Sequence, residues 1–251
     1  MIAVQFLTTL PIHGNHVRED KDLGRSMMFY PIVGLFMGAI TLAIYKLVSY
    51  FFLSSVSLVI ATIASIVLTG GLHIDGFADM CDGFYAGQDK TGILTIMKDS
   101  HIGTMAVIGV FCLLLLKLSL LASLLSRGKL MVAFLIVPSI SRWVMTVVAA
   151  SYPYARAEGG TAKPFVQNAG PTEISLSSVF ILIISYFLAG PAGILISFLT
   201  VGIALLIMIW VKRKIGGITG DVLGGMNEIS EVSALLILNL AYPILRTGWA
   251  T

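Results

Sequence analysis

The stretch that decides the fold runs from residue 174 to residue 211. It reads ISLSSVFILIISYFLAG (174–190) followed by PAGILISFLTVGIALLIMIWV (191–211) and holds no charged residue. Each half approaches the roughly 20 apolar residues that a helix needs to cross a bilayer. The Gly190–Pro191 junction between the halves is typical of a tight turn. We therefore predict two membrane-spanning helices joined by a short connection.

The rest of the chain has the same apolar character. Of its 251 residues, 57% are hydrophobic and 12% are charged, and the mean hydropathy is +0.95. Because a soluble domain typically carries about 25% charged residues, the composition argues against a water-soluble protein. The seven apolar segments that we predict to span the lipid bilayer are 27–53, 55–73, 102–126, 130–151, 174–190, 191–211 and 232–247.

These segments predict one all-α domain over residues 1–251, a polytopic transmembrane helical bundle of about seven spans. Residues 27–251 form the bundle, and residues 1–26 form an N-terminal interfacial or cytoplasmic segment. The apolar residues before Pro11 predict a short interfacial helix rather than a cleaved signal, because no basic residue precedes them. The net charge of +3 is mild, and we predict no nucleic-acid partner.

The charged residues predict which side of the membrane carries the chemistry. The connections on one side hold ten basic residues: Arg18, Lys21, Arg25, Lys90, Lys98, Arg156, Lys163, Lys212, Arg213 and Lys214. The other side holds three, Arg127, Lys129 and Arg246. By the positive-inside rule, the first side faces the cytoplasm. All 13 acidic residues fall on that side or at the mouth of a helix opening there, which predicts a cytoplasmic functional site.

The most informative polar segment reads GGLHIDGFADMCDG (70–83) and follows the second predicted span. Its aspartates, Asp75, Asp79 and Asp82, are spaced i, i+4, i+7 and share one narrow stripe if the segment is helical. Like charges at this spacing repel by roughly 0.2–0.5 kcal/mol per exposed pair. A divalent cation reverses that repulsion, and carboxylates that also meet phosphate suit Mg²⁺ or Mn²⁺. The alternative is a solvated acidic face at a helix end.

The spacing within this stripe also bears on the kind of chemistry. The rise from Asp79 to Asp82 is about 4.5 Å along a helix, which is compatible with two metals about 4 Å apart in phosphoryl transfer. Gly76 and Gly83 weaken the helix, and we expect them to let a phosphate approach the backbone. His73 lies opposite the stripe and is expected to be an interfacial or hydrogen-bonded residue rather than a ligand.

A second polar segment, GGITGDVLGGMNE (216–228), precedes the last predicted span. Its five glycines predict a nest of backbone N–H groups for an anion. Asp221 and Glu228 are seven residues apart and share a face if the segment is helical. The alternative is a flexible cytoplasmic loop.

Basic residues near these segments are candidates for binding an anion. In IMKDSHIGT (96–104), Lys98 suits a phosphate, while Asp99 and Ser100 suit capping of the next helix equally well. Arg142 lies inside a span, where a charge is costly, so we expect a phosphate or carboxylate partner. Arg156 is a weaker candidate for a phosphate contact.

Two further lysines lie in predicted spans. Lys46 and Lys117 are nearer the far side of the membrane than Arg142 is. We expect both side chains to extend to the interface, which gives neither a functional role.

Taken together, these motifs resemble the cobalamin synthase (adenosylcobinamide-GDP ribazoletransferase) family. The resemblance covers nearly the whole chain and rests on the segments 70–83 and 96–104, FLTTLP (6–11), Ser141–Arg142, YARAEG (154–159), TGDVLG (219–224) and Asn227–Glu228. Two places depart from the family pattern, Met80–Cys81 between the last two aspartates and Gly160–Thr161. Neither removes a charged position.

The resemblance implies a Mg²⁺-dependent enzyme of a bacterial or archaeal cytoplasmic (inner) membrane. A hydroxyl of α-ribazole, or of α-ribazole 5′-phosphate, attacks the cobinamide-linked phosphorus of adenosylcobinamide-GDP. GMP leaves, and adenosylcobalamin or its 5′-phosphate forms. Association into a homo-oligomer stays open.

On this resemblance we assign hypothetical roles to the candidate site residues. The metal ligands are Asp75, Asp79 and Asp82, with Asp221. The residues that bind phosphate or other parts of the substrate are Lys98, Arg142, Arg156 and Asn227. The catalytic set is Asp82 with Asp99 or Glu228, one of the latter two serving as the base.

Two alternatives remain at this point. Asp79, Asp82, Gly83 and Ala86 echo the start of a CDP-alcohol phosphotransferase signature, but Gly87 stands where that signature places an arginine. A cation transporter would also use aspartates, although its sites usually lie near the membrane midplane rather than at one face.

Overall fold

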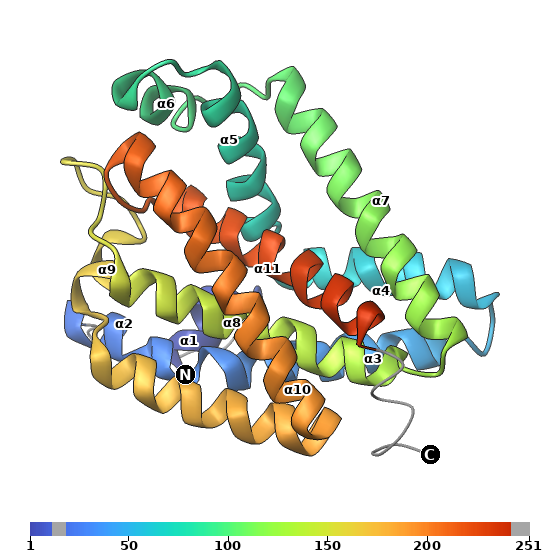
Figure 1. Cartoon of the computed structure of the whole chain (residues 1–251). Helices are drawn as coiled ribbons and strands as arrows, with labels where there is room; N and C mark the ends of the chain where they lie inside the picture. Colours follow the sequence, from blue (N-terminus) through green and yellow to red (C-terminus); the bar gives the residue numbers. More distant parts are fainter. Residues whose placement is uncertain (12–18, 242–251) are drawn as a thin grey trace.

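The computed structural model describes residues 1–11 and 19–241, and over these ranges the only regular elements are helices (Figure 1). The helices are α1 (Ile2–Leu7), α2 (Asp20–Ser26), η1 (Met27–Phe29), α3 (Tyr30–Val48), α4 (Ser54–Leu68), α5 (Leu72–Ala86), α6 (Lys90–Ile96), α7 (Thr104–Ser126), α8 (Leu130–Ser151), α9 (Lys163–Asn168), α10 (Pro171–Ile215) and α11 (Gly220–Leu240). The predicted all-α fold is confirmed.

Four helices in the described part are long and apolar enough to cross a membrane. They are α7, α8, α10 and the run Asp20–Val48 that joins α2, η1 and α3. The pair α4 and α5 gives a fifth if it is counted as one span, although the two helices are bent by 87° where they meet. A membrane protein is thus supported, with four to five candidate spans where we predicted about seven.

Helix α8 forms the centre of the bundle and is buried along almost its whole length. Helix α3 packs against it through Gly34 and Gly38, one turn apart. A Cβ atom at Gly34 would lie 2.3 Å from the Pro138 carbonyl oxygen, and one at Gly38 would lie 2.0 Å from the Phe134 oxygen. Small residues at this spacing let two helix backbones approach closely, as is common between membrane helices.

The segment quoted first, 174–211, lies in α10, which folds back on itself at Gly190 (Figure 1). Gly190 has φ +60° and ψ −149°, so the element consists of two arms rather than one straight rod. Across the turn, the Ser185 and Ser197 hydroxyls are hydrogen-bonded at 2.8 Å. The predicted break at this junction is confirmed.

The boundaries of α11 differ from the prediction. We expected a connection over 212–231, with 216–228 either helical or a flexible loop, and a span over 232–247. The helix begins at Gly220 and ends at Leu240, and residues 242–251 lie outside the described part. Helix α11 is not among the candidate spans. Its polar first half runs inside the bundle beside α5 and α8, as the orange-red helix in Figure 1 shows.

The glycines of α5 and α11 serve helix packing, which corrects two predictions. A Cβ at Gly76 would lie 2.8 Å from the Asp221 carbonyl oxygen, and one at Gly224 would lie 3.3 Å from the His73 Cα. A Cβ at Gly83 would meet Met97 of the segment after α6. Gly76 and Gly224 therefore bring the backbones of α5 and α11 together, and Gly83 makes room for the Met97 side chain, rather than admitting a phosphate. Gly224 lies within a helix rather than in an anion-binding nest.

Candidate active site

Helix α5 carries the three aspartates of the predicted stripe on one continuous helix. Gly71, with φ +73°, precedes its first residue, and the helix runs without a break to Ala86. Asp75 is exposed, and Asp79 and Asp82 are partly buried. The shared stripe is therefore confirmed, but its members have different neighbours.

The Asp82 carboxylate is hydrogen-bonded to the backbone at the start of α7. Its two carboxylate oxygens accept hydrogen bonds from the Gly103 N–H at 2.6 Å and the Ala106 N–H at 2.8 Å. Backbone N–H groups at a helix start lack partners within the helix, and an anion there is favoured by the helix dipole. Asp82 thus provides the cap that we had considered for Asp99 or Ser100.

Asp221 lies in the first turn of α11, where the Gly76 contact brings its backbone against α5. Its carboxylate accepts a hydrogen bond from Arg156 at 2.7 Å and one from the Thr219 hydroxyl at 3.2 Å. Burial raises the pKa of Asp221, and the neighbouring Arg156 guanidinium opposes that rise. Asp79 is within electrostatic range of both Asp221 and Arg156. The structure therefore brings together four predicted site residues: Asp75, Asp79, Asp221 and Arg156.

The loop that carries Arg156 is held in place by backbone hydrogen bonds. The Ala155 N–H donates to the Ile218 carbonyl at 2.8 Å, and the Ile218 N–H donates to the Pro153 carbonyl at 2.9 Å. The Arg156 Nε is buried and has no hydrogen-bond partner among the described residues. Arg156 is thus fixed beside Asp221, and its Nε–H is a buried donor without a described acceptor.

Lys98 and Asp99 lie at the surface, each with a neighbour of opposite charge. Lys98 pairs with Glu158 at 3.0 Å, and both side chains are mostly exposed. Asp99 accepts hydrogen bonds from the backbone and ring of His101, which lower the pKa of Asp99 and raise that of His101. A catalytic base is most effective with a pKa near the working pH, so this pairing does not favour Asp99 as the base.

The carboxylates do not converge as a preformed metal cage. Among residues 1–11 and 19–241, no three His, Cys, Asp or Glu side chains form a group that could hold an ion. Mg²⁺, however, is usually held by one or two carboxylates together with water and substrate phosphates. The donor set of Asp75, Asp79 and Asp221 fits that kind of site, since all are hard oxygen ligands around a single cation, Arg156.

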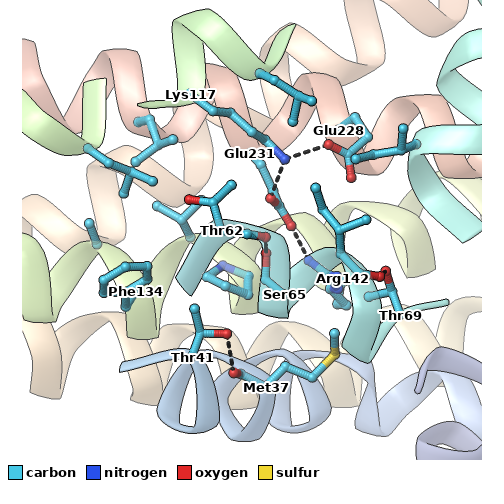
Figure 2. A pocket seen from close by; sticks show the side chains of 18 residues that line it. Met37, Thr41, Thr62, Ser65, Thr69, Lys117, Phe134, Arg142, Glu228 and Glu231 are labelled. Carbon is cyan, nitrogen blue, oxygen red and sulfur yellow. Dashed lines mark hydrogen bonds and ion pairs between the residues drawn. The ribbon is translucent and has the colours of Figure 1, made fainter. Parts of the chain in front are cut away.

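A second cluster of charges lies inside the bundle, around Glu231 of α11 (Figure 2). The Lys117 Nζ donates to Glu231 at 2.7 Å and also to Glu228, and Arg142 donates to Glu231. The Asn227 amide donates to Glu228 at 3.3 Å and to Glu231 at 3.4 Å. Two cations thus face two carboxylates, and the cluster has no net formal charge.

This cluster corrects several predictions. Lys117 is buried and ion-paired instead of extending to the interface. Arg142 has the carboxylate partner that we expected as one of two options. Glu228 is buried against Lys117 and is poorly placed to act as a base. Together with Glu231 it lies inside the bundle, so the acidic residues do not all gather at one face.

Glu231 was missed as a site residue because 212–231 was expected to be a connection. A helix assigned over 220–240 would have placed Asn227 and Glu231 four residues apart on one face, with Glu228 beside them. The cavity next to this cluster has a volume of about 70 Å³, with Lys117 and Arg142 among its lining residues. His73 is also buried nearby, and neither ring nitrogen has a hydrogen-bond partner among the described residues.

Comparison with known proteins identifies the family. The sequence profile of the family described as Cobalamin-5-phosphate synthase matches residues 1–239. The chain belongs to this family.

Three relatives are named adenosylcobinamide-GDP ribazoletransferase. One from Desulforamulus reducens is 34% identical, with 97% of this chain and 96% of the relative covered. One from Clostridium kluyveri is 35% identical with 94% of each covered, and one from Chlorobium phaeobacteroides is 37% identical with 92% of each covered. No solved structure matches the chain.

The cobalamin-5-phosphate synthase match includes both the stripe on α5 and the buried cluster on α11. Family membership therefore does not by itself decide which cluster performs chemistry. The geometry distinguishes them, because every carboxylate of the buried cluster has a basic partner and the stripe has carboxylates in excess.

Proposed function

We propose that this protein joins α-ribazole, or its 5′-phosphate, to adenosylcobinamide-GDP with release of GMP, the last step of nucleotide-loop assembly in cobalamin biosynthesis. The observation that carries the proposal is the full-length similarity to adenosylcobinamide-GDP ribazoletransferases. The reaction forms a bond between the ribazole oxygen and the cobinamide-linked phosphorus. It breaks the bond from that phosphorus to GMP, and the hydroxyl proton passes to a base or to solvent.

The α5 stripe and Asp221 are the proposed phosphate end of the site. Phosphoryl transfer depends mainly on positioning and on neutralising charge. Asp75, Asp79 and Asp221 would hold Mg²⁺, or Mn²⁺ in its place, which when bound would neutralise the diphosphate. Asp82 orients α7 against α5 through its two backbone contacts and thereby fixes the shape of the site.

Arg156 is the proposed phosphate-binding side chain. Its guanidinium is anchored to Asp221, and its buried Nε has no hydrogen-bond acceptor among the described residues. Arginine binds phosphate with a planar set of donors, so an anchored guanidinium is suited to orient a diphosphate. Lys98 adds a positive charge at the surface, where its exchange from Glu158 to a substrate phosphate costs little.

The site is proposed to face the cytoplasm of a bacterial or archaeal inner membrane. The excess of basic residues in the connections on that side supports this orientation. Nucleotide substrates are also water-soluble at their phosphate end, which matches a site built at a helix end rather than at the membrane midplane.

Neither alternative function is favoured. Gly87 still argues against a CDP-alcohol transferase. A transporter would use the buried Glu228 and Glu231, but both are already paired with Lys117 or Arg142.

Purified protein in lipid nanodiscs tests the proposal directly. Incubation with adenosylcobinamide-GDP, α-ribazole and Mg²⁺ is expected to yield GMP and a cobalamin in equal amounts. Chelation of the metal is expected to stop both products, and added Mg²⁺ to restore them. Absence of GMP with all substrates present, or GMP formed without ribazole incorporation, would overturn the proposed transfer.

A further inference from the structure

A wide groove runs along the outside of the stripe, between the bend that joins α4 to α5 on one side and α7 on the other. Its volume is about 1010 Å³, and Phe6 of α1 is among its lining residues. Its apolar wall includes Val107, Val110 and Phe111 of α7, while Thr8, Thr9 and Thr69 provide hydroxyl groups. This groove is large enough for a bulky ligand, unlike the cavity of about 70 Å³ beside Glu231.

The groove is continuous with the proposed phosphate end of the site. Asp75, the first aspartate of the stripe, lines the groove, and so does Ala78 one turn further along α5. Near the other end of the helix, Asp82 holds the start of α7 against α5. In Figure 1, α5 and α7 diverge from the segment that connects them, and residues of both helices line the groove. A ligand with phosphates at the stripe would therefore have its remaining bulk directed into the groove.

The chemistry of the lining indicates a ligand with little charge. Asp75 is the only charged residue that lines the groove in the described part of the chain. Each threonine hydroxyl already donates to a backbone carbonyl: Thr8 to Val4 at 2.7 Å, and Thr9 and Thr69 to carbonyls near the end of α4. Thr8 is buried and its oxygen also accepts from the Leu10 N–H at 3.4 Å, so the oxygens of Thr9 and Thr69 are the ones left to accept from N–H donors such as carboxamides.

We propose that this groove binds the corrin macrocycle of the donor substrate while the attached diphosphate lies at the stripe; this rests on the proposed function. The macrocycle offers broad apolar faces to the α7 wall and neutral carboxamides to the threonine oxygens. It is tethered to the diphosphate, so it has to lie within reach of Asp75. A lipid chain would cover the apolar wall but would leave the hydroxyl oxygens and Asp75 without polar partners.

Cysteine protection tests occupancy without any transfer reaction. Both native cysteines are first replaced, by Cys81→Ser and Cys112→Ser, and Phe111→Cys is introduced as the only reactive thiol. The protein in nanodiscs is then treated with a small thiol reagent, with and without cobinamide, which lacks the GDP group. We expect saturating cobinamide to slow the modification about tenfold, a difference of about 1.4 kcal/mol. Leu116→Cys, on another face of α7 and outside the groove, is the matched control and should react at an unchanged rate.

Steady-state kinetics give the second readout. Val110→Trp narrows the groove and is expected to raise the KM for adenosylcobinamide-GDP about tenfold, with the KM for α-ribazole unchanged within about twofold. Leu116→Trp should change neither of these KM values. Equal reactivity of Phe111→Cys with and without cobinamide would overturn the inference, as would protection by added phosphatidylglycerol but not by cobinamide.

The two proposals fail in different ways. Protection by cobinamide without GMP release would leave the groove assignment standing and refute the transfer reaction. Normal GMP release in Val110→Trp, with no protection at position 111, would support the transfer reaction and refute the groove assignment.

Discussion

The two ends of the polar half of α11 carry the same kind of ion pair in different surroundings. In the first turn, Asp221 pairs with Arg156, and both side chains are about one-fifth exposed, 21% and 19%. Ten residues later, Glu231 pairs with Arg142 and Lys117, whose side chains are 3% and 10% exposed. The inner cluster balances two cations with two carboxylates, whereas Asp221 shares Arg156 with the aspartates of α5. Only the outer end has negative charge to offer a metal ion.

The largest effect on stability is expected from removing a cation of the inner cluster of Lys117, Arg142, Glu228 and Glu231. Lys117→Met leaves Glu228 and Glu231 with one cation between them, and breaking a buried ion pair in this way costs about 3–5 kcal/mol. The free energy of unfolding in mild detergent, measured by denaturant titration, should fall by that amount.

The matched control for this prediction is the double variant Lys117→Met/Glu228→Gln, which restores the charge balance. It should recover most of the lost stability. If the single variant is as stable as the wild type, the inner cluster does not hold the bundle together as we describe.

The next largest effect is expected on activity, from removing a carboxylate of the α5 stripe beside Asp221. Asp79→Asn removes one proposed metal ligand, and the rate of GMP release should fall by about two to three orders of magnitude, comparable with the loss of one transition-state contact. The thermal unfolding midpoint should change little, because none of the described residues donates a hydrogen bond to the Asp79 carboxylate.

Asp20→Asn, at an exposed position of α2, provides the surface control and should retain activity. Wild-type turnover in Asp79→Asn, assayed over a range of Mg²⁺ concentrations, would remove the metal role from the stripe.

A smaller effect on stability is expected at Asp82, which belongs to the stripe but is bound like a helix cap. Asp82→Asn keeps one carbonyl oxygen and loses the negative charge at the α7 N-terminus, so it should cost about 1 kcal/mol of stability. Hydrogen exchange at the Gly103 and Ala106 amides should accelerate.

Activity is expected to fall further in Asp82→Asn than this loss of stability alone explains. Unchanged exchange rates at these amides would show that the cap does not depend on the carboxylate.

The smallest effect is expected for the surface pair. Glu158→Gln breaks the contact with Lys98, but exposed pairs typically contribute no more than about 1 kcal/mol. The unfolding midpoint should be the same as that of the wild type within error. A large loss would mean that the loop of residues 152–162 depends on this pair more than on its backbone hydrogen bonds to Ile218.

The sequence predicts those features that depend on local pattern. The boundaries of α7 and α8 agree with the predicted spans within a few residues, because uninterrupted apolar runs end at polar loops. The turn at Gly190 and the aspartate stripe on α5 could also be predicted, since both depend on residues close together in the sequence.

The features that were missed depend on contacts between distant segments. The polar residues 220–231 are typical of a loop until Lys117 and Arg142, from two other helices, supply their partners inside the bundle. Likewise, nothing local indicates that Asp82 accepts hydrogen bonds from residues 21 and 24 positions later.

The bond from Asp82 to the start of α7 also limits how the groove can change its width. Two helices fastened at one end can separate only by pivoting about that end, in the manner of a hinge. Any widening that admits a bulky molecule therefore occurs far from Asp82, towards α1 and the α4–α5 bend, while the fastened end keeps its spacing. Asp79, one turn from Asp82, would therefore keep its place while a large ligand enters or leaves, whereas Asp75, in the first turn of α5, lies at the end that widens.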